Sequence, residues 1–92
     1  MAVSIENIEE ILGMKKEEMM REGLIALLEK RYRELRAEIL TIYLKYKVSS
    51  LEEMDEKIIK GELSETETFD DFTKLDYLES EAEKIKEALK NL

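Results

Sequence analysis

The chain has 92 residues, of which 43% are apolar and 41% charged, and its net charge at pH 7 is −8. A chain of this length makes one domain with a limited core. It contains no cysteine and no histidine, which excludes disulfides, thiolate catalysis and the commonest general base and transition-metal ligand. The absence of proline and the three glycines favour long helices with charged outer faces. We therefore expect a helical protein that is not an enzyme and needs no cofactor.

The expected location follows from the N-terminal residues, and the expected partners follow from the distribution of charge along the chain. The first residues lack the basic and apolar regions of a signal peptide, and no apolar run reaches the ~18 residues of a membrane span. We expect a cytoplasmic protein that does not meet a membrane. Residues 14–47 carry nine bases and six acids, whereas residues 48–92 carry six bases and fourteen acids. This acidic half suits a partner protein with a basic surface, and it lacks the basic footprint of a nucleic-acid binder.

The N-terminal half predicts two helices. Residues 1–13 form a helical arm, with Ser4 as N-cap, a helix over residues 5–12 and Gly13 after its last turn. Residues 14–47 hold a long helix over 16–47, about 48 Å in length. At ~100° per residue its apolar side chains spread over roughly 200°, which one neighbouring helix cannot cover. The residues that we assign to an interface on this helix are Leu24, Leu28, Tyr32, Leu35, Ile39, Leu40, Ile42, Tyr43, Leu44 and Tyr46.

The C-terminal half predicts a short and a long helix. Ser50 and Glu53 have the spacing of a capping box, which starts a helix over residues 51–60. Residues 61–67 look like a loop, after which Thr68 caps a last helix over residues 68–92. The apolar seam of this helix suffices for one neighbour, and Phe69 and Phe72 extend it at its start.

These elements predict an all-α fold in a single domain, residues 1–92. The architecture is a long antiparallel helical hairpin with a short connecting helix and an N-terminal helical arm. Because the middle helix has more apolar surface than the rest of the chain covers, we expect a homodimer. Its form would be a four-helix bundle built from the two long helices of each copy.

Three side-chain clusters suggest sites, and each has a simpler interpretation. Glu53 and Glu56, with acids near the start of the last helix, have the i,i+3 spacing of Mg²⁺ ligands in helical nucleotide hydrolases. In so charged a chain, a solvated face is favoured. The basic stretch from Lys30 to Arg36 is interleaved with glutamates, which favours salt bridges along the helix. The tyrosines follow helical spacing, which favours packing over stacking on bases.

Residues 5–22 also resemble a helix-turn-helix, and residues 16–22 are similar to the second helix of ribbon-helix-helix repressors. The strand that precedes that helix in such repressors is not evident in this sequence. A single turn with glycine is common in other helical proteins. We therefore favour an arm that does not bind DNA.

Three stretches together carry a family resemblance: MREGLIALLEKRYRELRAEI, YLKYKVSSLEEMDEKIIKGE and FDDFTKLDYLE. Over residues 14–92 the chain resembles small helical proteins of archaea and bacteria that are presumed antitoxins of neighbouring toxin-like genes. The resemblance implies a non-catalytic protein that binds another protein, and it supplies no site residues. The leading hypothesis is thus an antitoxin-like interaction module with a basic partner. The alternatives are a purely structural homo-oligomer and an acidic-cluster, Mg²⁺-dependent nucleotide hydrolase.

Overall fold

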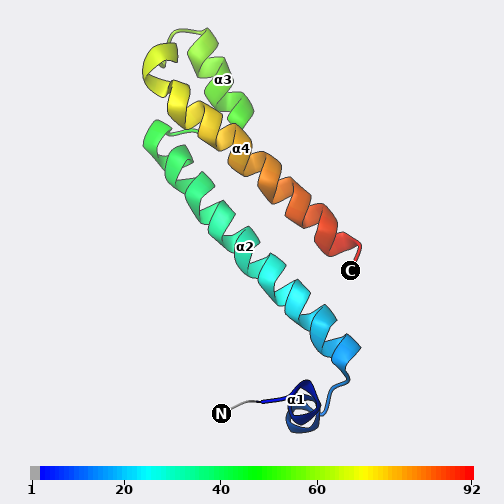
Figure 1. Ribbon diagram of the computed structural model, residues 1–92. Coiled ribbons are helices and arrows are strands. Elements are labelled where there is room, and N and C mark those ends of the chain that lie inside the picture. Colours follow the sequence, from blue (N-terminus) through cyan, green and yellow to red (C-terminus); the bar gives the residue numbers. More distant parts are fainter. Residues whose placement is uncertain (1–2) are drawn as a thin grey trace.

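The computed structural model describes residues 3–92, and these form four α-helices and no strand. The helices are α1 (Ile5–Leu12), α2 (Lys16–Tyr46), α3 (Leu51–Ile59) and α4 (Glu65–Lys90). Helices α2 and α4 lie side by side and run in opposite directions, with α3 in the connection between them (Figure 1). The predicted all-α fold, with its antiparallel hairpin, connecting helix and N-terminal arm, is confirmed.

Three helix starts are set by serine side chains. The hydroxyls of Ser4 and Ser50 accept hydrogen bonds from the backbone N–H groups of Asn7 and Glu53, as predicted. The second hydrogen bond of the predicted capping box, the one accepted by the Glu53 side chain, is displaced by one residue. The Glu53 carboxylate accepts from the N–H and the hydroxyl of Ser49, at 2.9 and 2.7 Å, rather than from the N–H of Ser50.

The prediction for the start of the last helix was wrong. Helix α4 begins at Glu65, because Ser64 caps it by accepting from the N–H of Glu67. Thr68, the predicted cap, lies one turn inside the helix, where it is buried and its hydroxyl donates to the carbonyl of Ser64 at 2.6 Å. The loop between α3 and α4 is correspondingly shorter than predicted.

The other long helix ends one residue before the predicted position. Lys47 has a φ of 55° and donates its N–H to the carbonyl of Tyr43, and the N–H of Val48 reaches the same carbonyl at 3.0 Å. This residue, with its left-handed backbone conformation, ends the helix in a position that glycine usually occupies. A lysine there bears a steric cost that glycine avoids.

The buried side chains all lie in one half of the hairpin. Among residues 3–34 and 83–92 none is buried. The half of the hairpin that carries α3 holds the whole core, and we call it the upper half. The buried apolar residues are Leu35, Ile39, Ile42, Val48, Met54, Leu75, Leu78 and Ala82.

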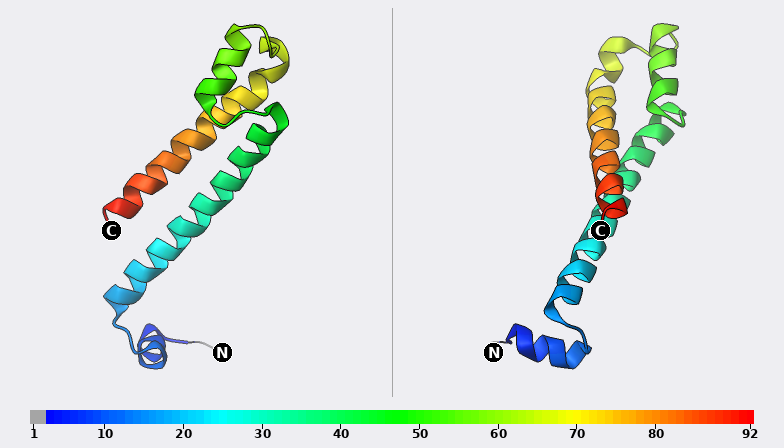
Figure 2. Two further views of the ribbon diagram at one scale, coloured as in Figure 1. Left: turned by 180° about the vertical axis from the view of Figure 1, so that it is seen from behind. Right: turned by 90° about the vertical axis from the view of Figure 1, so that its right-hand side faces the viewer.

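The molecule is a thin plate. Its principal extents are 61 × 30 × 16 Å, and the smallest of them is little more than the ~10–12 Å diameter of one helix. The radius of gyration is 19.6 Å, against about 12 Å for a compact domain of this length. In Figure 2 helix α1 lies across the N-terminal end of α2, past the point where α4 ends. The other half of the hairpin, which we call the lower half, therefore has no third helix beside it.

Candidate interaction surfaces

Two polar clusters fix the register of α2 against α4. In the first, Glu79 accepts a hydrogen bond from the Tyr43 hydroxyl and pairs with Arg36 at 3.5 Å. Together with the start of α3, these side chains line a cleft of about 280 Å³. Partial burial, and then the hydrogen bond to Glu79, raise the pKa of Tyr43 to about 12. Tyr43 thus stays neutral and acts as a donor at physiological pH.

The second cluster lies one turn nearer the end of α2. Asp71 accepts from the Lys45 ammonium at 2.7 Å and from the Tyr46 hydroxyl at 2.5 Å. The hydrogen bond from Lys45, followed by that from Tyr46, lowers the pKa of the Asp71 carboxyl, and the same bonds raise the pKa of both donors. Both clusters have their polar groups paired between α2 and α4, which holds the two helices in register.

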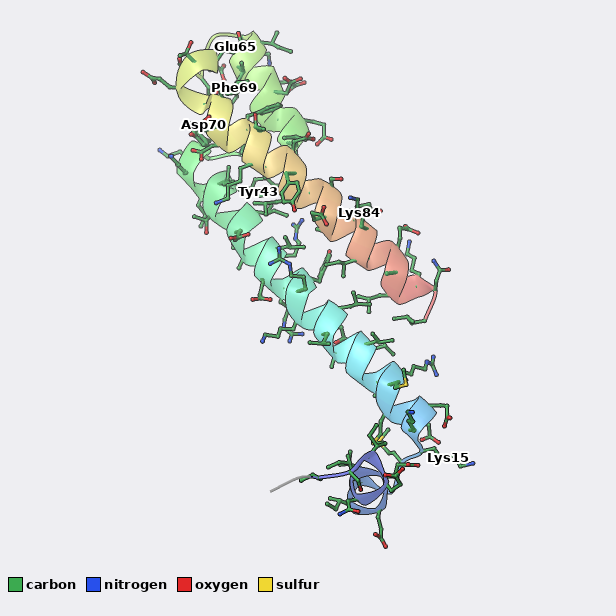
Figure 3. All side chains as sticks on the ribbon, in the orientation of Figure 1. Lys15, Tyr43, Glu65, Phe69, Asp70 and Lys84 are labelled. Atoms are coloured by element: carbon green, nitrogen blue, oxygen red, sulfur yellow. The ribbon has the colours of Figure 1, made fainter. Side chains whose placement is uncertain are left out.

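The acidic tip, which we define as residues 48–74, forms the end of the upper half. It carries nine acids and three bases. Between α3 and α4 it holds a pocket of about 180 Å³, lined by Ile58, Thr68, Phe69 and Phe72 with Asp55 and Glu65. Phe69 and Ile59 are largely exposed, and Figure 3 shows Phe69 beside Glu65 and Asp70 at this end. The tip thus offers apolar side chains surrounded by negative charge.

Phe69 lies elsewhere than the sequence pattern predicts. We expected it to extend the buried seam of α4, but the core position in that turn belongs to Thr68. One residue corresponds to ~100° of rotation, which carries Phe69 out of the seam and toward the pocket. The apolar periodicity of the sequence did not indicate Ile59, because this residue lies off the apolar stripe of α3.

The carboxylates proposed as Mg²⁺ ligands do not form a shared site. Within residues 3–92 no group of three or more acidic side chains is placed to hold a metal ion. Glu53 instead accepts from Ser49, and this hydrogen bond lowers its pKa. Of the basic stretch on α2, Arg36 pairs across the hairpin with Glu79 rather than along its own helix. The other bases of that stretch, Lys30, Arg31 and Arg33, are exposed.

The ten residues assigned to an interface on α2 divide into three groups. Leu35, Ile39 and Ile42 are buried inside the chain itself. Half-buried positions are Leu28, Tyr32, Tyr43 and Tyr46. The exposed ones are Leu24, Leu40 and Leu44.

Two largely exposed apolar positions of α2, Met20 and Leu27, were missing from the predicted interface. Together with Leu24 they follow a four-three spacing. That spacing is visible in the sequence, and it would have found both residues.

Helix α1 presents one apolar and one acidic side. Ile5 and Ile8 line a hollow of about 480 Å³ with Met19 and Met20 of α2, while Ile11 is exposed. The hollow on the other side of the junction, of about 560 Å³, is lined mainly by glutamates: Glu6, Glu9, Glu10 and Glu18 with Lys15. Such an acidic lining repels phosphate groups.

No helix within residues 3–92 is both long and apolar enough to cross a membrane. No solved structure matches the chain. It is 32% identical over 60 residues to the protein described as "Uncharacterized protein MJ0235" of Methanocaldococcus jannaschii, a match that covers 65% of this chain and 73% of that protein. The profile of the family described as "Uncharacterized protein MJ0235 family" matches residues 1–92. The chain therefore belongs to the Uncharacterized protein MJ0235 family.

Proposed function

We propose that the chain is a non-catalytic protein–protein interaction module that binds a basic partner through the acidic tip. The observation that carries the proposal is the pocket between α3 and α4. Its apolar wall includes Phe69 and Phe72, while Asp55 and Glu65 supply carboxylates beside it. Phe69 is largely exposed and lines this pocket, and an apolar patch bordered by polar side chains is typical of a protein-binding surface.

The pocket defines the chemistry of the partner segment. A volume of about 180 Å³ holds one aliphatic or aromatic side chain rather than a cofactor. Lysine or arginine beside that side chain would pair with Asp55 and Glu65. In such interfaces the apolar anchor supplies most of the binding free energy, and the charges accelerate encounter and select the partner. The net charge of −6 over residues 48–74 extends the attraction beyond the pocket.

The resemblance to presumed antitoxins supports the same class of partner. An antitoxin-like role places a basic, toxin-like protein on the tip, where it would cover both the pocket and the surrounding carboxylates. Because exposed charges are screened within about 8 Å at physiological salt, the association rate of such a complex should fall as salt rises. A partner held by apolar contacts alone would not show this dependence.

The experiment compares two exposed aromatic residues of α4. Phe69 is 64% exposed and lines the pocket, whereas Tyr77 is 59% exposed and lies outside it. The protein encoded beside this gene is co-expressed with the chain, and the affinity of the purified pair is measured by calorimetry. We expect Phe69→Ser to weaken binding at least about tenfold, which corresponds to 1.4 kcal/mol, and Tyr77→Ser to change it less than about twofold.

Equal losses from the two substitutions would show that the partner does not use the pocket. Absence of binding by the neighbouring product would contradict the antitoxin-like role. Circular dichroism of both variants checks that helix content is unchanged, since neither side chain belongs to the buried core.

A further inference from the structure

The lower half of the hairpin has an apolar face that this chain leaves uncovered. Counted at ~100° per residue from the buried Leu35, Met20, Leu24 and Leu27 lie within 80° on one flank of the α2 seam. Tyr43, which borders the start of α3 in the polar cleft, lies about as far on the other flank. Met20 and Leu27 therefore face away from α3, and Leu24 lies between them and the seam.

Helix α4 contributes to the same face. Counted in the same way from Leu75, Ile85 and Ala88 lie about 140–160° away from Phe72, which faces α3. They thus also face away from α3, on the side where α2 presents Leu24. We call this surface the open face and define it by Met20, Leu24, Leu27, Ile85 and Ala88. All five are half-buried or exposed.

The exposed area of the chain is large enough to accommodate a further partner. Its accessible surface is 7133 Å², against about 5,600 Å² for a compact monomer of 10.9 kDa. The excess, about 1,500 Å², exceeds the ~800 Å² that each partner contributes to a standard interface. A second copy seated on the open face through an interface of that size would remove about half of the excess.

Charge indicates that the occupant is a second copy rather than the basic partner of the tip. Residues 14–34 and 80–92, which surround the open face, carry nine bases and eight acids, whereas residues 48–74 carry three bases and nine acids. A nearly neutral apolar surface suits association between identical copies, because the two surfaces do not repel. The strongly acidic tip does not suit self-association.

We infer that two copies pack through their open faces as an antiparallel, two-fold homodimer, with the acidic tips at opposite ends. The lower part of α2, residues 16–34, is about 28 Å long. An overlap of that length separates the tips by far more than the ~8 Å over which exposed charges interact. A parallel dimer would instead place two tips and two acidic α1 helices side by side.

The first test compares two pairs of leucines on one helix. Leu27 is 65% and Leu44 69% exposed, so lysine at either position is tolerated in a single chain. Leu24 and Leu40 are the second members of the two pairs. By analytical ultracentrifugation we expect a dimer for the unaltered chain. The double variant Leu24→Lys, Leu27→Lys should raise the dimer dissociation constant at least about tenfold. The matched control Leu40→Lys, Leu44→Lys should leave it within about twofold.

A monomer at tens of micromolar for the unaltered chain would overturn the proposal. So would dissociation by the Leu40, Leu44 variant while the Leu24, Leu27 variant stays dimeric. A tip variant such as Phe69→Ser is expected to remain a dimer, so failure of the tip proposal and failure of this one are distinguishable.

The second test needs no change in the open face. The chain has no cysteine, so Lys84→Cys in the lower half and Glu62→Cys in the tip each give a single labelling site. Both residues are exposed. In mixtures of donor-labelled and acceptor-labelled protein, the antiparallel dimer should show energy transfer at position 84 and none at position 62. Transfer at both positions would refute the antiparallel sense, and transfer at position 62 alone would refute the open face as the interface.

Discussion

Replacement of Leu35 by alanine tests the position of the core most directly. Leu35 has no exposed surface, whereas Leu40, five residues further along the same helix, is 53% exposed. A buried leucine that becomes alanine loses both transfer free energy and packing, typically about 3–4 kcal/mol. A domain of 92 residues has a total unfolding free energy of about 5–14 kcal/mol. Leu35→Ala should therefore remove a large fraction of the stability.

The matched control is Leu40→Ala, for which we expect a loss of about 1 kcal/mol or less because much of the side chain stays in water. The assay is urea unfolding and thermal unfolding, both followed by helical circular dichroism at one fixed protein concentration. For Leu35→Ala the thermal midpoint should fall by about 15–30 °C, since 1 kcal/mol corresponds to about 4–8 °C in a domain of this size. Equal losses from both substitutions would refute the reasoning, because Leu40 would then be as buried as Leu35.

Three further changes test local features of the fold. Ser50→Ala removes the cap of α3 and should cost about 1 kcal/mol by urea unfolding, with Ser80→Ala, on the exposed side of α4, as a control near zero. Lys47→Gly should raise stability by about 0.5–1 kcal/mol in the same assay, because it relieves the left-handed backbone, and a loss would show that the lysine side chain is needed. Tyr43 has a raised pKa of about 12, so its stabilising effect should be complete below pH 10 and lost as pH rises toward 12. Tyr43→Phe should remove this alkaline loss, measured as the thermal midpoint against pH, and an unchanged profile would assign the loss to other groups.

The elements that the sequence predicts well are those with both a cap and a periodic apolar stripe. Ser50 with Glu53, and Gly13 after the first helix, mark boundaries that the structure reproduces within a residue. The start of α4 was missed although Ser64 and Glu67 have the same spacing as Ser50 and Glu53. Thr68 has good cap chemistry too, and residue preference alone does not choose between two caps one turn apart.

The candidate surfaces were only partly predictable. An excess of apolar surface on α2 follows from the angular spread of its leucines, but which of them the chain covers depends on where α4 lies. That position is set by pairs far apart in sequence, such as Lys45 with Asp71 and Arg36 with Glu79. Helical periodicity contains no information on such pairs. The pocket at Phe69 likewise exists only because α3 packs against α4.

The division of the hairpin into a buried and an unburied half has a consequence for its dynamics. Amide protons of α2 between Leu35 and Ile42 sit over a packed core and should exchange with solvent only when the whole domain unfolds. Those between Leu24 and Leu28 have few packed neighbours and should exchange by local fraying of the helix. If two copies associate through the lower half, this fraying slows as protein concentration rises. The exchange of the amide protons between Leu35 and Ile42 does not change. The same chain would thus hold a permanently rigid segment and a segment whose order depends on assembly.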